Sequence, residues 1–193
     1  MLSYEESLKI LKETNALIEG HFILSSGLHS PQYVQCAQLL SKPKKASYIC
    51  KSLAEKIKNH SGEFDLILSP AIGGIVIGYE IGKILDKETI FSERVKGKFE
   101  LRRDFIIKKN SKVLIVEDVI TTGKSSLECS KIVSEMGSQV VGYACIIDRT
   151  NGKSDIKENI ISQIELNIPT YSKDNIPKNL SLITPVKPGS RNL

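Results

Sequence analysis

The residues from Val113 to Ser125 carry the strongest chemical signal in the chain. An apolar run, Val113–Val116, is followed by two carboxylates and then, after Val-Ile, by the turn Thr-Thr-Gly-Lys-Ser. Hydroxyl groups, a glycine and the free N–H groups at the start of a helix form a cradle for phosphate. The carboxylates of Glu117 and Asp118 would repel phosphate and are suited to sugar hydroxyls or to a polyol that binds magnesium. The segment therefore predicts a site for a phosphorylated sugar.

The Gly-Lys-Ser of this turn also fits the end of a P-loop, but the rest of that pattern fails. The pattern G-x-x-x-x-G-K-[ST] requires glycine at position 118, where the chain has Asp118. We therefore exclude a P-loop. The alternative interpretation is an ordinary connection between a strand and a helix, which leaves the concentration of ligand-type residues unexplained.

Positive charge is concentrated in one segment. The chain has a net charge of +5, but residues 94–112 alone carry +6, so the remainder is nearly neutral. The basic residues of this segment are Arg94, Lys96, Lys98, Arg102, Arg103, Lys108, Lys109 and Lys112. Such a local field indicates a polyanionic partner, either a phosphorylated small molecule or nucleic acid. The alternative is a solvated lysine-rich surface loop, although three of the five arginines fall here.

A scaffold for these residues is predicted by alternating strand and helix patterns. Ser3 and Glu6 predict a capped N-terminal helix that ends near Gly20, and Pro43 can open a second helix. The expected strands are Phe22–Leu24, Tyr33–Cys36, Asp65–Leu68, Thr89–Ser92, Val113–Val116, Gln139–Ile147 and Ile160–Ile168. Continuous apolar strands between helices indicate a parallel sheet that is covered on both faces.

We therefore predict an α/β fold with a doubly wound parallel sheet as its core. The core is expected over about residues 43–150, and residues 1–42 and 151–193 would form a small hood on the same single domain. Ligands of such sheets bind beyond the carboxyl ends of the strands. The loops expected at that edge follow Leu68, Ser92, Val116 and Ile147.

Composition narrows the class of protein. With 40% hydrophobic and 25% charged residues, the chain is typical of a folded globular protein. No apolar stretch approaches the roughly 18 residues of a membrane span, and the acidic N-terminus is unlike a signal peptide. The sequence has no Trp and no recognisable nucleic-acid-binding motif. We expect a cytoplasmic protein without a membrane or nucleic-acid partner.

The cysteines are predicted to be buried free thiols in a reducing compartment. They are Cys36, Cys50, Cys129 and Cys145. None of them forms a C-x-x-C pair or lies in a cluster with histidine, so a metal site made by the protein alone is not expected.

Residues 117–125 resemble the phosphoribosyl pyrophosphate signature of type I phosphoribosyltransferases, in the form typical of orotate phosphoribosyltransferases. The resemblance continues, in the family's order, through Phe22–Tyr33, Pro70–Gly74, Asp148–Arg149 and Val186–Arg191. It implies transfer of a phosphoribosyl group to orotate, which gives orotidine monophosphate and pyrophosphate in pyrimidine (UMP) synthesis. It also implies magnesium as cofactor and a homodimer with shared active sites.

By this resemblance, one loop binds phosphoribosyl pyrophosphate. Its residues are Glu117, Asp118, Val119, Ile120, Thr121, Thr122, Gly123, Lys124 and Ser125. Orotate would contact Thr121, Arg149, Ser26 and Gly27, because an arginine can bind a planar carboxylate with two parallel hydrogen bonds. The alternative role for Arg149 is a structural ion pair with Asp148.

The resemblance assigns the leaving group to two further loops. Pyrophosphate would contact Ala71, Ile72, Gly73, Gly74 and Arg94. Asp118, Lys98, Lys96 and Arg94 are the catalytic candidates, and the choice between the two lysines stays open. The turn Ser69–Gly74 has a second interpretation, in which its glycines only permit a close approach of helix and strand.

The chain departs from the better-known family pattern at two positions. Ser25 and Gly73 stand where many relatives have lysine, and Arg102 and Arg103 could replace the missing charge. No histidine is assigned a catalytic role. Two alternative functions stay open: a phosphoribosyltransferase for another base, or a regulator that senses phosphoribosyl pyrophosphate without turnover.

Overall fold

The computed structural model describes residues 1–188 of the 193 in the chain. In chain order the elements are α1 (Tyr4–Glu13), β1 (Leu17–Ile23), β2 (His29–Val34), α2 (Cys36–Leu40), α3 (Pro43–His60), β3 (Leu66–Pro70), α4 (Gly73–Leu85), β4 (Glu88–Val95), β5 (Lys98–Leu101), β6 (Lys112–Ile120), α5 (Lys124–Glu135), β7 (Gln139–Asp148), β8 (Ile160–Glu165), the 3₁₀ helix η1 (Lys173–Asn175) and α6 (Lys178–Ser181). Gly189, Ser190 and Arg191, which end the C-terminal segment of the sequence resemblance, lie outside the described residues.

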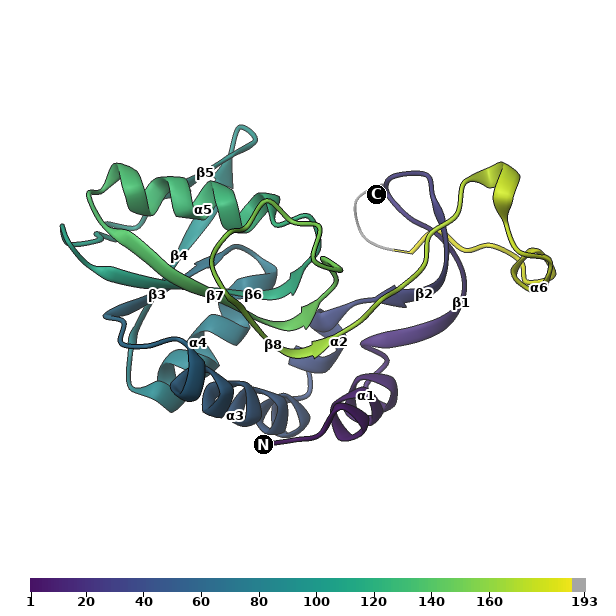
Figure 1. The fold of residues 1–193 in the computed structure, drawn as a ribbon, viewed down its shortest axis with the longest axis horizontal. Helices are drawn as coiled ribbons and strands as arrows, with labels where there is room; N and C mark the ends of the chain where they lie inside the picture. Colours follow the sequence, from purple (N-terminus) through teal and green to yellow (C-terminus); the bar gives the residue numbers. More distant parts are fainter. Residues whose placement is uncertain (189–193) are drawn as a thin grey trace.

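The core is a six-stranded sheet in the order β5-β4-β3-β6-β7-β8. Only β5 is antiparallel to its neighbour. Helices α3 and α4 lie on one face and α5 on the other (Figure 1). Side chains alternate along β6, so Leu114 and Val116 join one buried cluster while Val113 and Ile115 join the other. The predicted doubly wound α/β core is confirmed.

The strand order reverses between β3 and β6. From β3 the chain moves outward to β4 and then returns across β3 to β6. The loops that follow β3 and β6 therefore leave the sheet toward opposite faces and open a crevice between them. This crevice at the carboxyl edge of the sheet is the expected place for a ligand.

The core extends further along the chain than predicted. β8 pairs in parallel with β7, and its Ile161 and Ile164 are buried, so the predicted core boundary near residue 150 is too early. The N-terminal boundary near residue 43 is also wrong, because Leu11 and Leu39 belong to the same buried cluster as α3. β8 mixes apolar and polar residues, as is typical of an edge strand. For this reason its pattern did not indicate that it belongs to the parallel core sheet.

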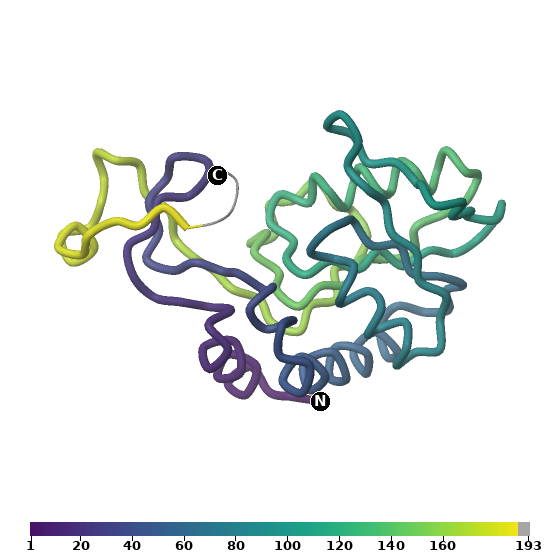
Figure 2. Tube along the Cα trace, turned by 180° about the vertical axis from the view of Figure 1, so that it is seen from behind, coloured from purple at the N-terminus to yellow at the C-terminus, as the bar shows by residue number. Residues whose placement is uncertain are grey.

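The hood is accordingly smaller: it consists of the β1–β2 hairpin and of residues 169–188, which we call the strap. Two isolated bridges join them, Phe22 with Val186 and His29 with Tyr171. Figures 1 and 2 show the hood beside the core, across from the carboxyl ends of β6 and β7.

The two expected strands overlap the β1–β2 hairpin only in part. β1 starts at Leu17, so the N-terminal helix ends at Glu13 and not near Gly20. β2 runs from His29 to Val34, so Cys36 begins α2 and is not in a strand.

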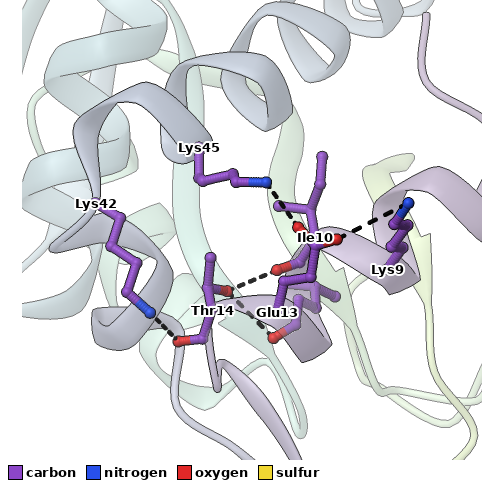
Figure 3. Close-up of polar contacts among 7 residues, drawn as sticks. Lys9, Ile10, Glu13, Thr14, Lys42 and Lys45 are labelled. Carbon is purple, nitrogen blue, oxygen red and sulfur yellow. Dashed lines mark hydrogen bonds and ion pairs between the residues drawn. The ribbon is translucent and has the colours of Figure 1, made fainter.

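The base of the hood is fastened to the core at the end of α1 (Figure 3). Lys45 of α3 pairs with Glu13 at 2.6 Å, and Lys42 Nζ donates to the carbonyl oxygen of Thr14 at 2.8 Å. At the other end of α1, Ser3 and Glu6 form the predicted capping box. α1 and the start of β1 are thereby held against α3.

The basic segment forms a hairpin where a loop was predicted. β4 continues to Val95 and pairs antiparallel with β5, and Lys96 and Gly97 form the turn with φ of 47° and 88°. Positive φ at both central residues is the geometry of the tight turns that match the twist of the strands. The alternation of Lys98, Phe99, Glu100 and Leu101 places Phe99 in the core, so the hairpin is anchored.

The remaining sequence predictions concern burial and membrane spans. The four cysteines are free and buried, as predicted. Among the described residues, no helix is both long and apolar enough to cross a membrane.

Candidate active site

The two adjacent carboxylates lie within β6 rather than after it, because this strand continues to Ile120. Consecutive residues of a strand face opposite sides of a sheet. Glu117 lies toward Ser126 of α5, whereas Asp118 lies against Gly73 at the start of α4. The two carboxylates therefore enter the crevice from its two sides.

Both carboxylates have raised pKa values. Burial, followed by the neighbouring charge of Asp118, raises the pKa of Glu117 to about 8. Burial also raises the pKa of Asp118, although the backbone N–H of Val119 donates to its Oδ1 at 3.0 Å and acts in the opposite direction. Groups with perturbed pKa values in a cleft are typical of functional sites.

The predicted phosphate turn joins β6 to α5. Gly123 precedes the helix with a φ of 77°, and a Cβ on it would lie 2.8 Å from the Ile156 side chain. Thr121, Thr122 and Lys124 are exposed, and the N-cap residue, Gly123, has no side chain to cap α5. The Lys124 N–H donates to Thr122 Oγ1 over a long 3.4 Å, and the next N–H groups of the first turn lack partners within the helix, so the start of α5 can bind an anion.

The turn after β3 brings Gly73 against one of the two site carboxylates. A Cβ on Gly73 would lie 2.8 Å from both carboxylate oxygens of Asp118, so a larger residue here would require the Asp118 side chain to shift. A Cβ on Gly74 would lie 3.1 Å from the carbonyl oxygen of Val116. Close approach of helix and strand therefore explains Gly74. Ala71 and Ile72 complete the turn, and the Ala71 N–H donates to the Ser92 carbonyl at 2.8 Å.

Arg149 follows β7 at the same edge of the sheet. Its backbone N–H donates to the Ile120 carbonyl oxygen at 2.8 Å, which places it beside the end of β6. Its Nε is buried without a hydrogen-bond partner, and burial lowers the pKa of its guanidinium. Asp148 instead accepts from the Thr150 N–H at 2.7 Å. Within the described residues Arg149 has no ion pair, so the predicted alternative of a pair with Asp148 is not observed.

The cations of the β4–β5 hairpin differ in whether an acidic side chain already pairs with them. Arg94 pairs with Glu128 of α5 at 3.0 Å and lies 4.1 Å above the Phe99 ring. Lys96 and Lys98 are exposed near the tip. The proposed substitutes, Arg102 and Arg103, both lie beside Glu93, which accepts two hydrogen bonds from Arg103 and lies 3.9 Å from Arg102.

The structure brings together the loops of β3, β6 and β7 but leaves the hood turn apart from them. Ser26 and Gly27 are exposed at the tip of the β1–β2 hairpin, where Gly27 has a φ of 81°. Both views show this turn to the side of the sheet (Figures 1 and 2). Among the described residues, no hydrogen bond joins this turn to the loops after β3, β6 and β7.

Sequence reasoning missed two supporting residues. Ile156 covers Gly123 from the segment before β8, and Glu128 holds Arg94 from the second turn of α5. Glu128 could have been noticed from the sequence. It follows Lys124 by four residues in the expected helix, so its side chain lies on the same face as the phosphate turn. In the described part of the chain, no three His, Cys, Asp or Glu side chains gather as a metal-binding group.

The chain is similar to known proteins over nearly its whole length. Residues 35–176 match the family described as phosphoribosyl transferase domain. An orotate phosphoribosyltransferase from Parvibaculum lavamentivorans is 43% identical over 193 residues, which is 100% of this chain and 100% of the relative. Another, from Erythrobacter litoralis, is 44% identical over 188 residues, which is 97% of each.

Solved structures share the fold. An orotate phosphoribosyltransferase from Aeropyrum pernix has a TM-score of 0.71 at 24% identity, over 82% of this chain and 92% of that chain. An adenine phosphoribosyltransferase from Thermoanaerobacter pseudethanolicus has a TM-score of 0.62 at 20% identity, over 70% of this chain and 88% of that chain. The fold thus occurs in enzymes named for different bases. The full-length relatives decide the family: the chain belongs to the phosphoribosyltransferases, within the group of the orotate phosphoribosyltransferases.

Proposed function

We propose that the protein transfers the phosphoribosyl group of 5-phosphoribosyl 1-pyrophosphate to orotate, releasing pyrophosphate and forming orotidine monophosphate for pyrimidine synthesis. The observation that carries this proposal is the unpaired, half-buried guanidinium of Arg149 beside the loop of β6. An unpaired buried donor is costly unless a ligand satisfies it. The carboxylate of orotate is such a ligand, and uracil and the purines lack it.

The 5-phosphate would bind at Thr121–Ser125. This role is supported by the N–H groups in the first turn of α5, the exposed hydroxyls of Thr121 and Thr122 and the ammonium of Lys124. Val119 and Ile120 would shape the loop from within β6. Glu117 and Asp118 would accept hydrogen bonds from the ribose hydroxyls, from the two sides of the crevice.

Magnesium fits the oxygen donors of this site. Carboxylates, hydroxyls and phosphate oxygens are the ligands that it prefers, and it usually keeps several waters. Glu117 and Asp118 are the carboxylates of this loop, so most ligands would come from the substrate and from water. When bound, the ion would neutralise charge that develops on pyrophosphate. Asp118 would orient the ribose beside it.

In the reaction, the bond from the anomeric carbon to pyrophosphate breaks and a bond to a ring nitrogen of orotate forms. Arg149 would hold the orotate carboxylate, and Thr121, Ser26 and Gly27 would add contacts. Positioning of this kind can supply much of the rate acceleration.

The leaving pyrophosphate needs donors and positive charge. Backbone N–H groups of Ala71–Gly74 and the cations Arg94, Lys96 and Lys98 would provide them. Because Arg94 already pairs with Glu128, the exposed Lys98 is the stronger candidate.

A cytoplasmic homodimer is part of the proposal. This part rests on membership of the orotate phosphoribosyltransferases, for which the resemblance implies active sites shared between two subunits. Mixing Arg149→Leu chains with chains whose hood turn is disrupted by Gly27→Pro tests the sharing, provided that each variant alone is nearly inactive. Shared sites predict partial recovery of turnover in the mixture, whereas independent sites predict none.

Turnover of the purified protein tests the reaction. Orotate, uracil, adenine and hypoxanthine are offered separately with phosphoribosyl pyrophosphate and magnesium, and pyrophosphate release is followed. We expect release with orotate alone. Reaction with a purine would contradict the role of Arg149, and binding without turnover would favour a sensor.

A further inference from the structure

Two buried histidines of the hood are bonded to each other. Nε2 of His21, on β1, lies 2.7 Å from Nδ1 of His29, on β2. Nδ1 of His21 lies 2.8 Å from the carbonyl oxygen of Ile183 in the strap. The two residues are only 4% and 7% exposed. The histidine pair therefore links both strands of the hairpin to the strap.

The bonding partners determine where the protons lie. A carbonyl oxygen only accepts, so Nδ1 of His21 must carry a hydrogen. In a neutral His21, Nε2 is then an acceptor, and Nδ1 of His29 must donate to it. One arrangement of protons thus satisfies both bonds while both rings are neutral.

The pair lies between two backbone bridges. On one side, the Val186 N–H donates to the His21 carbonyl at 2.8 Å and the Ile23 N–H donates to the Val186 carbonyl at 2.9 Å. On the other side, His29 and Tyr171 exchange two hydrogen bonds of 2.8 Å. The turn that carries Ser26 and Gly27 begins directly beyond these bridges.

We propose that His21 and His29 act as a latch that holds the strap on the β1–β2 hairpin and positions the Ser26–Gly27 turn. The latch tolerates one added proton and opens on the second. The assignment of orotate to the turn rests on the proposed function, whereas the latch itself does not.

The geometry of the two hydrogen bonds explains why the latch can hold one added proton but not two. A first proton enters at Nε2 of His29, which takes part in neither bond. A second proton must enter at Nε2 of His21, where two N–H groups and two positive charges would then face each other across 2.7 Å.

Other ionisable side chains occur on the elements that pack here. They are Glu19 and Tyr33 in the hairpin and Tyr171, Lys173, Asp174, Lys178 and Lys187 in the strap. Glu19 pairs with Lys12 at 2.7 Å, and Tyr33 packs on Phe22. The titration must therefore be assigned with histidine variants.

Amide hydrogen exchange of the full-length protein tests the latch, between about pH 7.5 and pH 5. We expect protection of the Ile23, His29, Tyr171 and Val186 amides to fall on acidification, by at most about tenfold per pH unit because one proton is linked. Proton–nitrogen correlation spectra should show hydrogen on Nδ1 of both rings at the higher pH. Unchanged protection would overturn the proposal.

Two variants and a control separate the latch from general acid effects. Asn at position 29 can donate through Nδ2 or accept through Oδ1, so His29→Asn should keep the protection and remove its pH dependence. His29→Leu should lose protection at both pH values. His60→Gln, at the exposed end of α3, should behave like the wild type. A pH step that persists in His29→Asn would contradict the latch.

The functional consequence is measured separately. At low pH, KM for orotate should rise more in the wild type than in His29→Asn, while kcat changes less. If the protein does not turn over orotate at all, the proposed function fails but the exchange result still decides the latch. If turnover is normal and the amides show no pH step, the latch alone is wrong.

Discussion

The carboxyl edge of the core and the hood differ in how their site residues are held. At the core edge, Asp118 fills the space beside Gly73, and Ile156 covers Gly123, so each group is fixed by a neighbour. In the hood, Ser26 and Gly27 lie exposed on a hairpin tip, and a few hydrogen bonds hold that hairpin to the strap. In the proposed function, the contacts to phosphate, to ribose and to the carboxylate of orotate would thus be built into the core. The contacts from Ser26 and Gly27 would depend on the position of the hood.

Among substitutions at the core edge, Asp118→Asn should lower kcat/KM the most. Loss of charged hydrogen bonds to two hydroxyls, at about 2 kcal/mol each, predicts about a 1,000-fold fall in kcat/KM. Because burial disfavours the charge of Asp118, the same variant should be more stable than the wild type. Steady-state kinetics and thermal unfolding measure both effects. Asp174→Asn, on exposed η1, is the control, and a fall in stability of Asp118→Asn would contradict the account.

Arg149→Leu should separate base binding from phosphoribosyl binding. Arg149 is only half-buried, so its two charged hydrogen bonds count at about 1.5 kcal/mol each, and their loss predicts about a 150-fold fall in kcat/KM for orotate. KM for phosphoribosyl pyrophosphate should stay within about threefold, since the phosphate turn is untouched. Arg149→Lys should recover only part of the activity, because lysine lacks the planar fork. Equal weakening of orotate and phosphoribosyl pyrophosphate binding would contradict this role and show that Arg149 stabilises the structure of the whole carboxyl edge.

Glu117 should make the stability of the core edge depend on pH. Its pKa is raised to about 8 from 4.5, so the folded state holds a proton that the unfolded state releases. Stability should therefore fall as pH rises from 4.5 to about 8 and then level off. Glu117→Gln should be more stable than the wild type by about 5 kcal/mol above that window and by nothing below it, because each pKa unit corresponds to about 1.4 kcal/mol. An equal gain at every pH, measured by denaturant unfolding, would contradict the raised pKa.

The hairpin lysines should give the smallest effects. Both side chains are exposed, so solvent and salt screen their charges. We expect Lys98→Ala to lower kcat/KM about fivefold and Lys96→Ala about twofold, with both losses shrinking at high salt. Lys108→Ala, at another exposed site, serves as the matched control. A larger loss for Lys96 than for Lys98 would reverse their assignment.

Sequence patterns predicted the parts of the fold that depend on local signals. The apolar run at Val113–Val116 and the turn at Thr121–Ser125 identify β6 and its loop, because burial and turn chemistry act over a few residues. The hairpin at Lys96–Gly97 was missed because charge masked the alternation around Phe99.

Features that depend on distant contacts could not be predicted in this way. The histidine pair joins positions 21 and 29 to position 183 through tertiary contacts alone. The position of β8 in the core sheet likewise depends on its neighbour β7. Asp118 against Gly73 combines two motifs that are 45 residues apart, and only the sheet order brings them together.

A crystal structure with orotidine monophosphate bound would test the central claim most directly. We predict its phosphate at Thr121–Ser125, its ribose hydroxyls at Glu117 and Asp118, and its base carboxylate on the Arg149 guanidinium. The Ser26–Gly27 turn should reach the base, from the same chain or from a second subunit. A base carboxylate held elsewhere, with Arg149 still unpaired, would contradict the account.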